Sequence, residues 1–326
     1  MSSSFSWHTL FNEFKTGKRA ALLRPHSPSF LKSFWQFSRP HTIIGTTLSV
    51  FALYGIALAI GEHHFKLSQL ATVLPVWLAC LAGNVYIVGL NQLTDVAIDR
   101  INKPHLPLAS GAFSNKQGNL IVMTMGISAI AIAALSGLWL FATVTISLII
   151  GTAYSLQPFR LKRFPLLAAI CILAVRGVVV NLGLFAHYNS KFSGQVVISN
   201  EIWLLTAFIF FFSLAIAIFK DVPDLEGDKQ YNIATFSLIL GKAKVFQVTL
   251  LTISICYFGA ITTALTLNLA ANTWLFVSSH FALLVILWWR SRDVDLEDKN
   301  AIASFYQFIW KLFFLEYILF PLACWI

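Results

Sequence analysis

The residues from Asn91 to Asp99 (NQLTDVAID) have the types and spacing to bind a metal ion. They follow a long uncharged segment, which predicts that they lie at the end of an apolar helix. If that helix continues through them, residues four apart share one face, about 6 Å apart along the axis. Asn91, Asp95 and Asp99 would then form a single stripe of side-chain oxygens.

A second acidic stretch, DVPDLEGD, lies about 130 residues further along the chain. Asp221, Asp224 and Asp228 follow the i, i+3, i+7 spacing of one helix face, whereas Glu226 points about 200° around a helix from Asp224 and is expected to be solvated. Carboxylates rarely lie in a membrane without a partner, so two stripes beside apolar segments predict a bound cation. Mg²⁺ is the natural candidate, because it takes one or two carboxylates and completes its octahedral shell with water and phosphate oxygens.

The composition is that of a polytopic membrane protein. Of 326 residues, 57% are hydrophobic and only 11% are charged, which is too apolar for a soluble domain of this length. Segments of about 20 apolar residues can each cross a bilayer, which predicts an all-α protein with turns near Gly137 and 268–272. The nine expected spans are 41–60, 70–92, 119–137, 140–157, 165–187, 202–220, 245–267, 272–289 and 304–325.

Residues 1–38 are expected to form a separate basic segment, ahead of a membrane domain over 39–326. Phe30, Leu31, Phe34 and Trp35 recur at helical spacing, which indicates a helix lying in the membrane interface. A Ser-rich, acid-poor start also faintly resembles an organelle transit peptide.

The net charge is +9. The positions of the charged residues along the chain indicate a membrane orientation and not nucleic-acid binding. With the amino terminus in the cytoplasm, nearly all Lys and Arg residues fall on the cytoplasmic face, and the exceptions are Lys66, Lys191, Arg176 and Lys311. The positive-inside rule therefore fixes the orientation, and both acidic stretches lie on this basic face. The isolated cysteines offer neither a disulfide framework nor a metal site, and no obligate protein partner is indicated.

Acidic and basic side chains together at one membrane face suggest a metal-bridged polyanion with an apolar tail. A prenyl diphosphate fits this description. Metal and cations would stabilise the departing diphosphate as the allylic carbon–oxygen bond ionises, and a water-poor pocket would protect the carbocation. An ion-coupled transporter is the alternative from another class, but its binding groups are expected near the bilayer midplane, on broken helices of inverted repeats.

The segments NQLTDVAIDRINKP and KDVPDLEGDKQ resemble the two aspartate motifs of the UbiA-type intramembrane prenyltransferase superfamily. Within it, FSRPHTIIGTTLS at 37–49, NQLTDVAIDRINKPHLPLASG at 91–111 and FYQFIWKLFFLEY at 305–317 resemble the homogentisate phytyltransferase branch in its cyanobacterial form. The resemblance implies a helical bundle around a central cavity and a Mg²⁺-dependent transfer from phytyl diphosphate to homogentisate. It also implies a thylakoid or plasma membrane, with the active site facing the cytoplasm. Geranylgeranyl and solanesyl diphosphate stay open as donors, and another acceptor, such as the chlorophyllide ring, also stays open.

The resemblance can be applied position by position. It implies that residues of the two acidic stretches bind metal ions directly or through water, and that the last two aspartates of each stretch take part in catalysis. Gln92 departs from the pattern, because many members of the superfamily have Asp there. The expected metal ligands are Asn91, Asp95, Asp99, Asp221, Asp224 and Asp228, of which Asp95, Asp99, Asp224 and Asp228 are the catalytic set. The expected substrate contacts are Arg39, Arg100, Lys103, Tyr154, Lys162, Arg176 and Lys220.

Some of these substrate contacts come from the resemblance and others from position alone. Arg160, Lys162 and Arg163 could equally be a positive-inside anchor. Arg176 lies within the fifth span, where an unpaired cation is costly. It is expected to face the cavity and to meet either diphosphate or the acceptor carboxylate; the alternative is a structural ion pair with a carboxylate such as Glu316. Lys311 and Glu316 are expected to form a mutual or interhelical pair.

Overall fold

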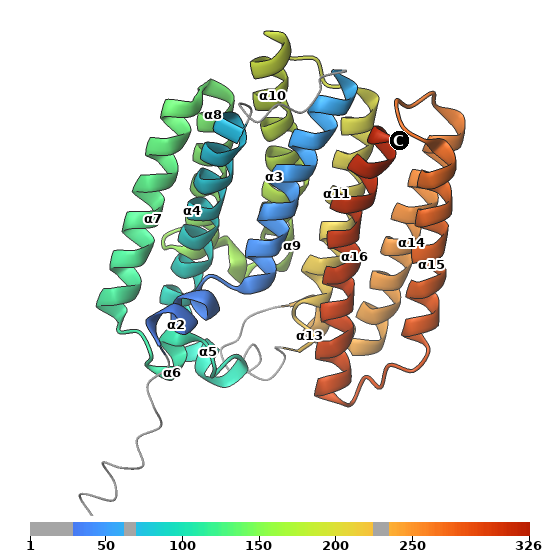
Figure 1. Cartoon of the computed structure of the whole chain (residues 1–326). Coiled ribbons are helices and arrows are strands. Elements are labelled where there is room, and N and C mark those ends of the chain that lie inside the picture. Colours follow the sequence, from blue (N-terminus) through green and yellow to red (C-terminus); the bar gives the residue numbers. More distant parts are fainter. Residues whose placement is uncertain (1–28, 62–69, 224–234) are drawn as a thin grey trace, which may run out of the picture.

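The computed structural model describes residues 29–61, 70–223 and 235–326, and its regular structure there is helical, without strands. In this part of the chain, nine helical segments are long and apolar enough to cross a membrane, and each overlaps one predicted span (Figure 1). The predicted all-α polytopic class is thereby confirmed. The segments are α3 (Pro40–Ile60), α4 (Leu70–Thr94), α7 (Asn115–Ser136), α8 (Leu138–Ser155), α9 with η3 and α10 (Pro165–Ser193), α11 (Asn200–Phe219), α14 (Lys242–Thr266), α15 (Thr273–Ser291) and α16 (Lys299–Trp325).

Short helices gather at one end of the bundle, at the bottom of Figure 1, and the carboxyl terminus lies at the other end. They include α2 (Phe30–Phe37), α5 (Val96–Asn102), α6 (Pro107–Ser110) and α13 (Phe236–Leu240). The predicted interfacial helix corresponds to α2, which exposes Phe30, Leu31 and Trp35 and buries Ser33 and Phe37. Residues 1–28 lie outside the described part.

Local capping residues set the turns between paired spans. Gly137 separates α7 from α8 at φ 138°, a conformation that glycine adopts without steric penalty. At the start of α15 the Oδ1 of Asn272 accepts a hydrogen bond from the backbone N–H of Leu275 at 3.0 Å, which satisfies a donor that the helix itself leaves free. Both predicted turns are confirmed.

The first acidic stretch does not continue the helix that precedes it. Helix α4 ends at Thr94, Asp95 has φ −121° and ψ 17°, and α5 begins at Val96. The prediction of one unbroken helical stripe is therefore wrong. The Asp95 carboxylate instead forms ion pairs with Arg160 and Lys162, and two charge-assisted contacts in a partly buried site outweigh a helical hydrogen bond worth about 1 kcal/mol.

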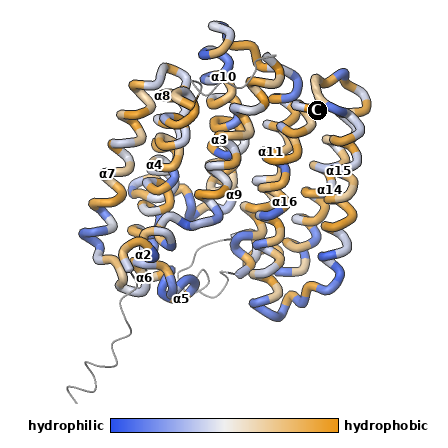
Figure 2. Tube along the Cα trace, viewed as in Figure 1, coloured by the Kyte–Doolittle hydropathy of each residue, from blue (hydrophilic) through white to orange (hydrophobic). Residues whose placement is uncertain are grey.

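The bundle is apolar both inside and on its sides. Phe212, Tyr257 and Phe305 are buried in the core shared by α11, α14 and α16. Leu135 and Trp274, by contrast, are more than three-quarters exposed, as expected of side chains that face lipid. Figure 2 shows hydrophilic residues concentrated at the end that carries α2, α5 and α6. This is the end to which the first acidic stretch belongs.

The fifth span contains a π-helical stretch, η3 (Leu173–Val179), that packs closely on α11 at Gly177. A Cβ at Gly177 would lie 2.8 Å from the Cα of Phe210, a backbone atom that cannot rotate away. We expect Gly177→Ala to destabilise the protein by about 1–3 kcal/mol. Thermal unfolding in detergent would measure the loss.

Gly259→Ala is the matched control for Gly177→Ala. Gly259 lies within α14, where an added Cβ meets no atom within 4 Å. Alanine is also the better helix former, so this variant should unfold at the wild-type temperature or slightly above it. Equal unfolding temperatures for the two variants would contradict close packing of η3 on α11.

Candidate active site

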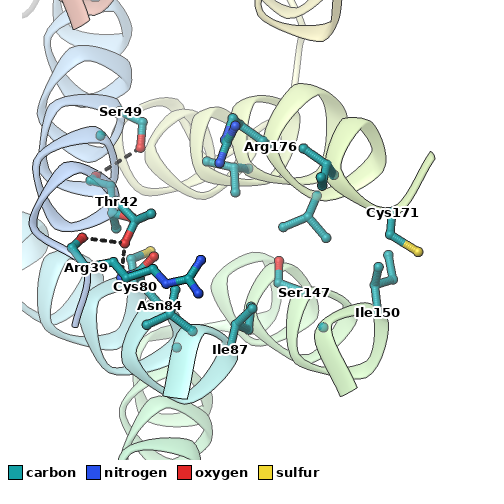
Figure 3. A pocket seen from close by; sticks show the side chains of 18 of the residues that line it. Arg39, Thr42, Ser49, Cys80, Asn84, Ile87, Ser147, Ile150, Cys171 and Arg176 are labelled. Carbon is teal, nitrogen blue, oxygen red and sulfur yellow. Dashed lines mark hydrogen bonds between the residues drawn. The ribbon is translucent and has the colours of Figure 1, made fainter. Parts of the chain in front are cut away.

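A cavity of about 310 Å³ lies within the bundle, between α3, α4, α8, η3 and α16 (Figure 3). One end is cationic and polar, with Arg39, Asn91 and Lys220. An apolar wall lies between α8 and α9, where Ile150 and Cys171 line the space. The central cavity that the resemblance implied is present, and its lining changes from charged to apolar.

A continuous set of contacts connects three separate segments at the polar end. The Nη2 of Arg39 donates a hydrogen bond to the Oδ1 of Asn91 at 3.2 Å. The Nδ2 of Asn91 donates in turn to the Oδ2 of Asp95 at 3.1 Å. Asp95 forms ion pairs with the Nη2 of Arg160 at 3.2 Å and the Nζ of Lys162 at 2.7 Å. The end of α4 and the loop after α8 thus meet at the Asp95 carboxylate, and the start of α3 joins them through Asn91.

Lys162 is held in a low-dielectric position at this junction. Its Nζ also donates to the Oγ1 of Thr94 at 2.7 Å, and its side chain is only 10% exposed. Burial lowers the pKa of Lys162, while the carboxylate of Asp95 acts in the opposite direction. The contact between the Asp95 carboxylate and Arg160 shows that Arg160 does more than anchor the loop at the membrane surface.

In the described part of the second acidic stretch, Asp221 lies next to a cavity-lining residue, Lys220. Lys220 lines the cavity, and its Nζ lies 2.7 Å from the Oδ1 of Asp221. Asp221 is buried. Asp224, Glu226 and Asp228 lie outside the described residues, so the convergence of the two acidic stretches stays a prediction.

Asp95, Arg160 and Lys162 are not among the residues that line the cavity, and Asp95 adjoins it through its hydrogen bond with Asn91. The later residues of the first stretch also lie outside the lining. Asp99 is buried on α5, Arg100 is exposed, and Lys103 follows the end of α5. None of the three lines the cavity in the described part, because the helix break at Asp95 redirects α5. Gln92 is completely buried, and its Nε2 donates to the backbone carbonyl of Phe37 at 2.7 Å. An aspartate could not donate this bond.

Tyr154 and Arg176 line the cavity, and Arg176 was expected to face it. Their contact with substrate stays a prediction. An aromatic wall on α16 was missed. Its spacing of three and four residues places its members on one helix face, a signal that the sequence contains but that general aromatic richness concealed. The aromatic wall consists of Tyr306, Trp310, Phe313 and Tyr317.

The polar end has the donor chemistry that Mg²⁺ requires. Asn91 and Asp95 are neighbours that supply an amide oxygen and a carboxylate, and hard cations prefer oxygen ligands. The Asn91 amide nitrogen faces Asp95 and its oxygen accepts from Arg39, so a metal bound by that oxygen would replace the Arg39 contact. Among the residues that can be placed, no three His, Cys, Asp or Glu side chains converge. A magnesium ion held there would therefore take further ligands from water, from substrate phosphate, or from the second acidic stretch.

The chain is similar to several known proteins. A homogentisate phytyltransferase from Synechocystis sp. is 58% identical over 91% of this chain and 96% of its own length. A chloroplastic homogentisate phytyltransferase 1 from Arabidopsis thaliana is 42% identical over 89% of this chain and 75% of its own. A UbiA homolog from Archaeoglobus fulgidus, bound to GPP and Mg²⁺, has the same fold, with a TM-score of 0.60 and 19% identity over 89% of this chain and 99% of its own. The sequence pattern of the UbiA prenyltransferase family matches residues 48–312, and the chain belongs to that family.

Proposed function

We propose that this chain is a homogentisate phytyltransferase that moves a phytyl group from phytyl diphosphate to homogentisate. The product is 2-methyl-6-phytylbenzoquinol, and carbon dioxide and diphosphate are released. The observation that carries the proposal is a cavity whose cationic end adjoins an aromatic and apolar interior. Such a lining suits a molecule with an anionic head and an apolar tail, and the similarity to relatives named for this reaction supports the choice of substrates.

The polar end would bind the diphosphate. Arg39 and Lys220 supply positive charge there. Lys162 is paired with Asp95 beside the cavity, and a diphosphate would compete with Asp95 for it. Asn91 and Asp95 would hold Mg²⁺, together with aspartates of the second acidic stretch. The bound ion would neutralise negative charge on the diphosphate and so favour its departure.

The interior would control the second half of the reaction. The bond between phytyl C1 and oxygen breaks, and its electron pair leaves with the diphosphate. A ring carbon of homogentisate then bonds to C1 and loses its proton, while the acetate side chain loses carbon dioxide and gains a proton. Trp310 and Phe313 enclose this space. They would exclude water from the allylic cation.

Product formation by membranes that express the chain tests this function. Homogentisate would be supplied with phytyl, geranylgeranyl or solanesyl diphosphate in the presence of Mg²⁺. The expected result is a phytylated quinol formed faster than either other product. A faster geranylgeranyl or solanesyl reaction would change the assigned donor, and no reaction with any of the three by folded protein would reject homogentisate as the acceptor.

We also infer that the active site faces the cytoplasm, in a thylakoid or plasma membrane. The polar end carries Arg39, Arg160 and Lys162, whereas Lys191 lies towards the opposite end of its span. The positive-inside rule favours this orientation. A carboxyl-terminal reporter should then report the non-cytoplasmic side, and a cytoplasmic signal from it would reverse the assignment.

A further inference from the structure

Arg176 is fixed in the cavity wall by the π-helical stretch η3. Asn181 donates hydrogen bonds from its Nδ2 to the carbonyls of Arg176 at 3.2 Å and Gly177 at 2.7 Å. The hydroxyl of Tyr317 donates to the Oδ1 of Asn181 at 2.8 Å. A single amide side chain therefore satisfies carbonyls of η3 and connects η3 to α16. π-Helical turns often occur at functional sites.

The guanidinium of Arg176 lies against the aromatic wall of α16. Its Cζ is 4.8 Å from the centroid of the Trp310 ring and 5.6 Å from that of Phe313. Its Nη1 is buried and has no hydrogen-bond partner among the residues that the structure describes. The Arg176 side chain thus presents an unused donor in a cavity (Figure 3).

The carboxylate expected to pair with Arg176 is engaged elsewhere. Glu316, the expected structural partner, lies 3.2 Å from the Nε2 of His280, and both side chains are completely buried. Neither Arg176 nor Lys311 forms a described ion pair with Glu316. A cation within a membrane span is costly without a counter-charge, so Arg176 is suited to an anion that enters the cavity.

The proposed reaction brings two anions into the cavity, the diphosphate of the donor and the carboxylate of the acceptor. The residues around Arg176 indicate which of the two it binds. Arg176 lies about eleven residues after Pro165, within the fifth span. Arg160 and Lys162 lie in the loop before Pro165. The diphosphate belongs at the polar end, whereas Arg176 is bordered by flat aromatic rings that match an aromatic acid.

We propose that Arg176 binds the carboxylate of the aromatic acceptor and thereby selects acceptors that carry one. The acceptor ring lies along Trp310 and Phe313, with its carboxylate directed inwards and its reactive edge towards the donor. The inference rests on the proposed function for its acceptor, because homogentisate supplies the carboxylate.

Arg176→Gln tests the assignment through binding. The probes are homogentisate, followed by tryptophan fluorescence of purified protein in nanodiscs, and inorganic diphosphate, measured by competition with the prenyl donor. A lost charge-assisted contact should weaken homogentisate binding roughly 10- to 100-fold, while diphosphate affinity stays within about twofold. Unchanged homogentisate affinity, or a loss of diphosphate affinity instead, would overturn the proposal.

Two controls keep this test decisive. Lys311→Gln removes another mid-span cation, but one that is exposed on α16, and it should leave both affinities unchanged.

The wild-type protein can also be tested with the neutral amide of homogentisate, which needs no variant to fold. The amide should bind at least roughly tenfold more weakly than the acid, and equal binding would reject the role of Arg176. Homogentisate binding could weaken in Arg176→Gln while the wild-type protein transfers no phytyl group. The proposed reaction would then be wrong, but the assignment of Arg176 to the acceptor carboxylate would be kept.

Discussion

Replacing Asp95 with asparagine is expected to lower phytyl transfer by about 10³-fold, while the protein still folds and inserts. Asn91, Arg160 and Lys162 all contact the carboxylate of Asp95. Asparagine keeps the shape and an acceptor oxygen but loses the charge, and a neutral amide is a weaker Mg²⁺ ligand than a carboxylate. Initial rates of quinol formation, normalised to folded protein, would measure the effect.

Asp293→Asn is the matched control for Asp95→Asn. Asp293 is exposed in the connection between α15 and α16, so its replacement removes a negative charge without touching the cavity. This variant should retain wild-type rates. If Asp95→Asn kept more than about a tenth of the wild-type rate, the carboxylate would not provide the several kcal/mol expected of a metal ligand.

The second large effect is expected at Arg39. Arg39→Gln should lower kcat/KM for the prenyl donor by about 10²-fold, because a hydrogen bond from a charged group to a phosphate is lost in a water-poor site. Arg39 precedes α3 at φ 53°. Both side chains would experience similar strain in this conformation, so the comparison isolates the guanidinium. Steady-state kinetics with varied donor would provide the measurement.

Arg292→Gln removes an exposed guanidinium that follows α15, and it should leave kcat/KM for the donor unchanged. Arg39→Lys should fall between wild type and Arg39→Gln, because lysine keeps the charge but loses the planar pair of donors. A normal kcat/KM for the donor in Arg39→Gln would remove Arg39 from the diphosphate site.

The spans could be predicted from sequence because hydrocarbon imposes a simple requirement. Every backbone polar group must be paired inside it, so long uncharged segments have to be helices. Gly137 and Asn272 then mark turns through their own backbone and capping chemistry. Candidate site residues could also be proposed, since charged groups beside apolar segments are few, and Arg39, Arg176 and Lys220 among them line the cavity.

The relative placement of those residues could not be predicted from spacing alone. Helical periodicity assumed that Asp95 continues α4, but its ion pairs with Arg160 and Lys162, more than 60 residues away, break the helix. The same tertiary contacts direct Asp99 and Arg100 away from the cavity. The burial of Gln92 beneath Phe37 likewise depends on the packing of α2, which local sequence does not encode.

Binding of a non-ionising thiolo analogue of phytyl diphosphate, with and without Mg²⁺, tests most directly whether the polar end holds a metal-bridged diphosphate. Purified wild-type protein in nanodiscs should bind the analogue at least roughly tenfold more tightly with Mg²⁺ than with EDTA, because the ion connects carboxylate and phosphate oxygens. Asp95→Asn should lose most of this difference. Equal affinity with Mg²⁺ and with EDTA in the wild-type protein would contradict the account.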